Sequence, residues 1–164
     1  MSEPIELLCG PAAGPDAFSD AFSRVPAEVL ETMFFAEAEP ACCEHAWLPS
    51  AEAVCIGFDG SHTGVMRLCV SREAADSIAS AFLGLEPMEI TEALAAQVIL
   101  ELANILCGAI LSHAWPESKL ALSPPQVCAG APEYERAEHH CFEMPEGKLA
   151  VWVHWSEAAG PVEG

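Results

Sequence analysis

One long apolar segment constrains the fold of this chain more than any other feature. Within residues 93–111 all but four residues are apolar, and the exceptions are Gln97, Glu101, Asn104 and Gly108. With Ser112 after them, they follow at spacings of four, three, four and four, which puts them on one face of an α-helix. The pattern therefore predicts a helix over residues 91–113, ended by Pro116, that is buried on most sides and carries one narrow polar stripe.

The polar stripe has two interpretations. A solvent-facing edge of a core helix is the simpler one, although such an edge more usually carries Lys, Glu or Arg. Asn is an indifferent helix former that competes for backbone hydrogen bonds, so Asn104 one turn from Glu101 also indicates a functional surface. Gly108, a further turn along, leaves that surface open to the close approach of another molecule.

The same apolar segment is long enough to cross a membrane. However, a carboxylate near the centre, here Glu101, costs about 2.5–3.5 kcal/mol on insertion, and no cluster of Lys or Arg flanks the segment. A buried helix in a soluble domain is therefore the prediction, and no membrane is expected as a partner.

The charge of the chain excludes further partners. The sequence has 25 acidic and 6 basic residues, which gives a formal net charge of −19. Binding to nucleic acid requires a surplus of Lys and Arg, so a nucleic-acid partner is excluded, as are anionic membrane surfaces. A partner that responds to this charge presents Lys, Arg or a bound cation.

Shorter patterns fill the rest of the chain. A first helix is expected over residues 21–36, with Pro26 in its first turn, where a missing N–H costs nothing. Another helix is expected over residues 72–82, capped by Ser71 and ended by Gly84. The expected strands are residues 41–48, 52–58, 63–70, 119–123, 136–144 and 148–155.

The order of these elements is a helix followed by strands, twice. We predict an α+β fold in which two long helices pack on one antiparallel β-sheet, with duplicated helix-plus-strands halves related by a pseudo-twofold axis. A chain of 164 residues that is 52% hydrophobic supports one such domain. It is expected at residues 21–156, after a lead-in rich in Pro, Gly and Ala at 1–20 and before a short tail at 157–164.

The last expected strand is apolar on both faces, because Trp152 alternates with Val151 and Val153. Such a pattern is unusual for a strand that is open to water. The strand is therefore either central and covered on both sides, or part of a dimer interface.

The chain has eight cysteines, which could form disulfides or bind a metal ion. Residues 1–10 contain no basic residue and only a brief apolar run, so they predict no secretory signal and favour a cytoplasmic protein with reduced thiols. Two clusters on neighbouring expected strands invite a zinc site, namely Cys42-Cys43-Glu44-His45 and His139-His140-Cys141. Neither has the Cys-x-x-Cys spacing of structural zinc sites, so we predict no metal.

The polar stripe also carries a resemblance to a known family. Glu101-Leu102-Ala103-Asn104, with Gly108 after it, resembles the Glu-x-x-Asn-x-x-x-Gly helix motif of the CheC/CheX/FliY chemotaxis phosphatases. Residues 120–127 resemble the short strand and proline that close this motif, and residues 29–33 resemble the first long helix of the CheX branch. The likeness in element order runs from residue 22 to residue 155.

The sequence departs from the family pattern at three places. Gln97 stands where the family often has Asp or Ser, and the proline spacing is a residue or two short. Two-site members carry a second Glu-x-x-Asn on the first helix, but here the matching stretch is Glu31-Thr32-Met33-Phe34. Because Phe34 replaces the second amide, the resemblance implies one active site, as in the CheX branch.

The resemblance implies a phosphatase that acts on a phosphorylated CheY-like receiver, whose phosphoryl group is carried on an aspartate. Asn104 would hold the attacking water, and Glu101 would pair with the active-site Lys of the receiver. Gln97 and Gly108 would contact the partner. Mg²⁺ would belong to the receiver, so no cofactor of the chain's own is expected. CheX pairs through its sheet, which implies a homodimer, and an adaptor that uses the same fold without turnover is the alternative.

Overall fold

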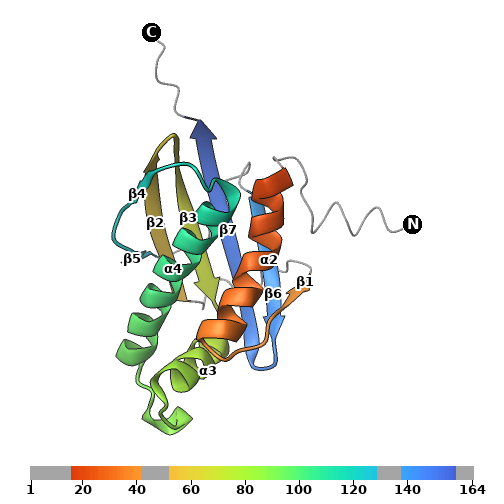
Figure 1. The fold of residues 1–164 in the computed structure, drawn as a ribbon. Coiled ribbons are helices and arrows are strands. Elements are labelled where there is room, and N and C mark those ends of the chain that lie inside the picture. The colour runs from red at the N-terminus through yellow and green to blue at the C-terminus, as the bar shows by residue number, and fades with distance from the viewer. Residues whose placement is uncertain (1–15, 42–51, 129–137, 158–164) are drawn as a thin grey trace, which may run out of the picture.

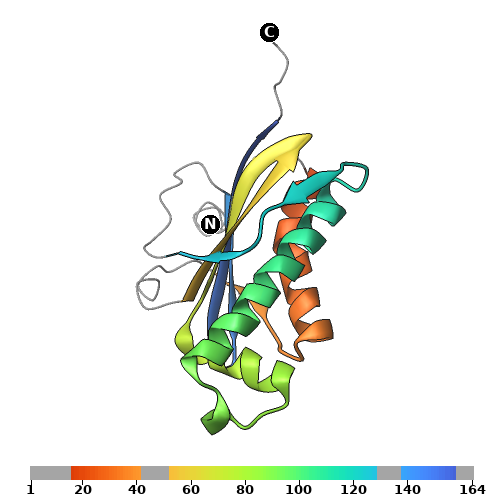
Figure 2. The ribbon, with the colours of Figure 1, turned by 90° about the vertical axis from the view of Figure 1, so that its left-hand side faces the viewer.

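Two long helices lie on one face of an antiparallel β-sheet (Figures 1 and 2). The computed structural model describes residues 16–41, 52–128 and 138–157. In these residues the helices are α2 (Asp16–Met33), α3 (Arg72–Leu83), the short 3₁₀ helix η2 (Pro87–Glu89) and α4 (Glu92–Ala114). The predicted α+β class, with long helices packed on one sheet, is therefore confirmed.

The sheet has seven strands in the described part of the chain, in the order β1-β6-β7-β3-β2-β4, and β5 also pairs with β2. Their bounds are β1 (Glu39–Ala41), β2 (Glu52–Gly60), β3 (His62–Val70), β4 (Leu120–Leu122), β5 (Gln126–Val127), β6 (Glu138–Met144) and β7 (Gly147–Glu157). Each half of the chain supplies one hairpin, and β3 and β7 join the hairpins at the centre. Since β1 pairs with β6 and β4 pairs with β2, each half also lends an edge strand to the other, which is consistent with a pseudo-twofold arrangement.

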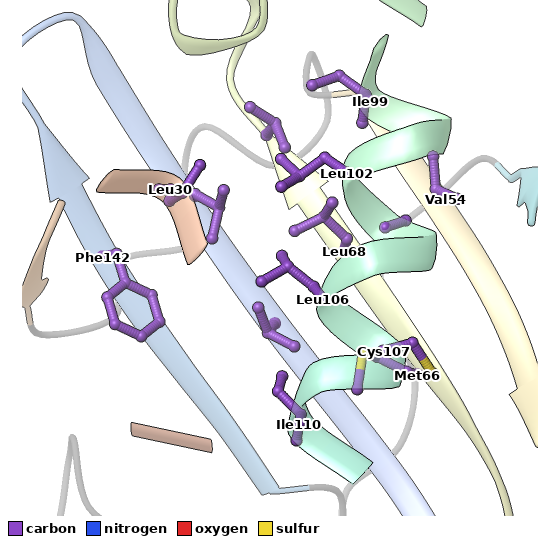
Figure 3. Close-up of a cluster of buried hydrophobic side chains, with 14 of the residues drawn as sticks. Leu30, Val54, Met66, Leu68, Ile99, Leu102, Leu106, Cys107, Ile110 and Phe142 are labelled. Carbon is purple, nitrogen blue, oxygen red and sulfur yellow. The ribbon is translucent and has the colours of Figure 1, made fainter. Parts of the chain in front are cut away.

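The long apolar segment forms α4 as expected, and its ends follow from local chemistry. The Thr91 side chain accepts a hydrogen bond from the backbone N–H of Leu94 at 3.1 Å, which caps the first turn. Trp115 ends the helix, one residue before Pro116. The buried side chains of α4 point toward the sheet in Figure 3, where Leu102, Leu106 and Ile110 face β3 and β7.

Helix α2 begins earlier than predicted, at Asp16 instead of residue 21, so the placement of Pro26 in the first turn is wrong. Pro26 lies inside the helix, where it removes one backbone hydrogen bond. Packing and charge offset that loss: Phe22 is fully buried, and Arg24 forms an ion pair with Asp20 at 2.7 Å on the exposed side. The helix also ends before residue 36, because Phe35 adopts a left-handed conformation with φ of 55°.

Helix α3 and the strands lie close to their predicted positions. Ser71 caps α3 by accepting a hydrogen bond from the N–H of Ala74, and Gly84 ends it in the left-handed conformation with φ of 70°. Of the strand expected at residues 41–48, only Ala41 lies in the described part of the chain, at the end of β1.

Strand β7 is central, between β3 and β6, as the first explanation of its apolar character requires. Val151 and Val153 face the helices as part of the main core. Trp152, which is 5% exposed, packs on the other face in a small cluster with Ala53, Cys69, Cys141 and Ala150.

The prediction that the cysteines are reduced thiols is wrong for Cys141. Cys141 is disulfide-bonded, and its partner lies outside the described residues. Cys55, Cys69, Cys107 and Cys128 are free.

Candidate functional site

The predicted polar stripe is exposed along α4. Gln97, Glu101, Asn104 and Ser112 are exposed, and Gly108 is half-buried. The other side of the helix carries its ten buried residues, which pack inward. The helix is therefore fixed on its inner side, and its outer side presents a carboxylate and an amide one turn apart.

The side chains of this stripe are available to another molecule. Gln97, Glu101 and Asn104 make no side-chain hydrogen bond or ion pair to any other residue that the structure describes. An amide offers both donors and acceptors, and a carboxylate offers acceptors for a cationic partner. Because the inner side of α4 is packed into the core, the backbone positions of these three residues are fixed relative to one another.

The segment of residues 120–128 runs along the outer edge of the sheet, and β4 lies beside the C-terminal end of α4 (Figure 2). Between its two short strands, the N–H of Ser123 donates to the carbonyl of Gly57 at 2.8 Å, and the N–H of Gly57 donates to the Ser123 hydroxyl at 2.8 Å. Pro124 and Pro125 follow, where the pairing with β2 is interrupted. This is the strand-and-proline segment that the resemblance placed beside the motif.

A pocket of about 160 Å³ lies at the C-terminal end of the polar stripe. Gly108, Leu111 and Ser112 of α4 line one side, and Leu120 and Leu122 of β4 line the other. Sequence reasoning missed this pocket, because its two walls come from elements that only the fold brings together.

Aromatic contacts fix one of the side chains that line the pocket. Trp115 also lines the pocket, and its ring stacks on His62 with centroids 3.6 Å apart and packs edge-on against Trp155. These contacts tie the end of α4 to the tip of the β2–β3 hairpin and to the last strand.

The first helix does not supply a second site. Phe34, where a second amide would stand, is fully buried and stacks on Phe82 with ring centroids 4.7 Å apart. Its side chain is part of the core and cannot reach a partner. The sequence-based expectation of one site agrees with this packing.

No three His, Cys, Asp or Glu side chains come together in a metal-binding arrangement among the residues that the structure describes. Residues 42–45 of the candidate zinc clusters lie outside them. On β6, His139 stacks on Trp152, and His140 packs edge-on against Phe22. The side chains of the two histidines therefore lie on opposite faces of the sheet.

A search with protein-family models finds one family for this chain. The model "Chemotaxis phosphatase CheX" matches residues 53–145, which include all of β2 but its first residue, β3 to β6, and all of α4. The chain belongs to the CheX family. It is thus a member of a family of chemotaxis phosphatases, and Glu101 and Asn104 lie within the matched region.

Solved structures share the fold of this CheX-family chain. CheX from Vibrio vulnificus has a TM-score of 0.70 and 19% identity, covering 88% of this chain and 100% of that one. A CheC-like protein from Shewanella sp. PV-4 has a TM-score of 0.70 and 17% identity over 87% and 99% of the chains. The CheX–CheY–BeF3–Mg²⁺ complex from Borrelia burgdorferi gives 0.67 and 21% over 85% and 98%. Curated proteins give no match.

Helix α4 meets the length and hydropathy criteria for a membrane span. One helix of this kind is weak evidence, because the core helix of a soluble domain meets the same criteria. Half of the most apolar 18-residue stretch of α4 is buried inside the protein. The sequence-based preference for a core helix is consistent with that packing.

Proposed function

We propose that this CheX-family chain hydrolyses the aspartyl phosphate of a CheY-like receiver, with Glu101 and Asn104 of α4 as the working pair. The observation that carries the proposal is that both side chains are exposed, one turn apart and without partners among the described residues, on a helix that is otherwise packed into the core. The Borrelia burgdorferi complex, in which CheX is bound to CheY with BeF3 and Mg²⁺, supports a receiver as the partner.

An acyl phosphate is already a good phosphoryl donor, so the phosphatase has little covalent chemistry to perform. It gains rate by placing a water molecule in line with the phosphorus atom and by fixing the two proteins in register. In this proposal, the Asn104 carbonyl oxygen accepts a hydrogen bond from the attacking water. The Glu101 carboxylate accepts one from the Lys ammonium of the receiver.

The receiver supplies Mg²⁺ in this scheme, and the chain contributes no cofactor. Gln97 lies one turn before Glu101, on the side away from Asn104. It is proposed to contact the partner there. The −19 charge of the chain favours encounter with a partner that presents cationic groups.

Glu101→Gln tests the proposed ion pair. The carboxamide keeps the shape of the side chain but loses its charge, so we expect kcat/KM toward a phosphorylated receiver to fall by roughly tenfold at low salt. The effect should lie mainly in KM and should shrink as ionic strength rises. Steady-state kinetics at two salt concentrations measure both.

The matched control is Glu31→Gln, on the exposed side of α2, which changes the net charge of the chain equally. It should alter the rate far less. Equal losses in the two variants would mean that net charge matters and that Glu101 has no specific partner.

Gly108→Ala tests whether the partner approaches α4 closely. A Cβ added at Gly108 would meet no atom within 4 Å, so the chain itself has room for alanine. The free energy of unfolding should rise by about 0.5–1 kcal/mol, because alanine is the better helix former. Receiver turnover should fall by roughly fivefold or more, because the methyl group would intrude on the docked partner. Thermal unfolding and turnover assays on the same sample separate the two effects, and unchanged turnover would contradict the close approach.

We further propose that the chain is a cytoplasmic homodimer. The support for the dimer is the resemblance to CheX. Sedimentation equilibrium of the full chain tests the oligomeric state directly, and a monomer at micromolar concentration would contradict it.

A further inference from the structure

We propose that Cys55 and Cys128 are a site of reversible disulfide formation, which covalently ties the end of the segment of residues 120–128 to strand β2. This inference is independent of the phosphatase proposal. It concerns the face of the sheet opposite the helices.

The backbone brings the two cysteines together. Strands β5 and β2 pair with Val127 opposite Val54, and the N–H of Cys128 continues this pairing by donating to the carbonyl of Ala53 at 2.9 Å. Side chains alternate between the two faces of a strand, so Cys55 lies on the same face as Ala53. It therefore stands diagonally across from Cys128.

The sulfur atoms are already in near-bonding contact. Although 73 positions separate the cysteines in the sequence, their Sγ atoms are 2.6 Å apart. That is roughly half an ångström longer than a disulfide bond, so the bond requires only a small side-chain movement. Both residues are half-buried, which leaves a small oxidant a path to them.

The surroundings assign the two sulfur atoms different roles. Nη1 of Arg67, a residue only 7% exposed, donates a weak hydrogen bond to the Cys55 sulfur at 3.9 Å. Burial, and then the hydrogen bond with Cys55, raises the pKa of the Cys128 thiol to about 12. The Cys128 thiol is therefore the less ready of the two to react, and the first reaction with an oxidant is assigned to Cys55.

The reaction balances with a peroxide as oxidant. The Cys55 thiolate attacks one peroxide oxygen, the O–O bond breaks, and Cys55 becomes a sulfenic acid while the leaving hydroxide takes up a proton to form water. The Cys128 sulfur then attacks the Cys55 sulfur, the S–O bond breaks, and the hydroxide that leaves takes the Cys128 proton as a second water. Two thiols are oxidised to a disulfide, and one peroxide is reduced to two waters.

The test uses the full chain, reduced with dithiothreitol and then exposed to hydrogen peroxide. We expect the intact mass to fall by about 2 Da for this bond, and peptide mapping to find Cys55 linked to Cys128. The bond closes a long loop, so the melting temperature should rise by on the order of 10 °C and return with dithiothreitol.

The matched variants are Cys128→Ser, which removes one partner, and Cys107→Ala, which removes a buried thiol of α4 in the core on the other face of the sheet. Cys141 forms a disulfide of its own, which Cys128→Ser leaves unchanged. The difference in mass and melting temperature between this variant and the unmodified chain therefore reports the Cys55–Cys128 bond alone. Cys107→Ala should keep the cross-link and the shift, and Cys128→Ser should lose both. The proposal is overturned if both thiols remain open to alkylation in the oxidised, folded chain, or if Cys55 links to any other cysteine.

Discussion

Replacing Asn104 with alanine should lower turnover of a phosphorylated CheY-like receiver by about 10²–10³-fold, the loss typical of removing one preorganised donor or positioning group. In the proposed mechanism, the Asn104 amide is the group that places the attacking water, and alanine offers no hydrogen bond in its place. Binding of the receiver should change much less, because Glu101 and the rest of the stripe remain. The decay rate of the phosphorylated receiver, followed with and without the variant, measures the loss.

Ser112→Ala is the matched control, two turns further along the same exposed stripe. It should leave the decay rate within a factor of about two, as expected for a surface substitution away from the reacting groups. Neither variant should lower the melting temperature, since both side chains are exposed and alanine is a good helix former. If Asn104→Ala hydrolyses the receiver at the rate of the unmodified chain, Asn104 does not place the water. If the unmodified chain binds the receiver without speeding its decay, the chain is an adaptor.

Leu106→Ala should give a large loss of stability. Leu106 is fully buried between the helix and the sheet, so the substitution removes apolar contacts and leaves a cavity (Figure 3). The expected cost is about 3 kcal/mol in the free energy of unfolding, or a fall in the melting temperature of roughly 10 °C. Chemical denaturation with urea measures it.

The adjacent, half-buried Ile105 provides the control for that prediction. Ile105→Ala should cost clearly less, because less apolar surface leaves the core. At a temperature where both variants are folded, each should retain receiver turnover, since neither side chain belongs to the polar stripe. Equal destabilisation by the two substitutions would contradict the burial pattern of α4.

The parts of the fold that were predictable are those set by local chemistry. The spacing of Gln97, Glu101 and Asn104 in an apolar run defines the exposed side of α4, and Thr91 and Pro116 bracket the helix. Ser71 and Gly84 likewise mark α3. These features depend on neighbours within one or two helical turns.

The parts that failed depend on contacts between distant segments. Pro26 is typical of a helix start, but α2, with Phe22 buried, begins at Asp16, before the predicted start at residue 21. The exchange of edge strands between the halves, the pocket beside Trp115 and the approach of Cys55 to Cys128 all join residues far apart in the sequence. No periodicity in the chain encodes those pairings.

The exposed stripe and the core of the domain share α4 without sharing residues. The positions that face outward, 97, 101, 104, 108 and 112, touch little else in the described part of the chain, whereas their neighbours on the helix fill the core. A combinatorial library confined to these five positions should therefore yield folded proteins at high frequency. Selection from it could redirect the surface to a different receiver, or separate docking from turnover, on an unaltered scaffold.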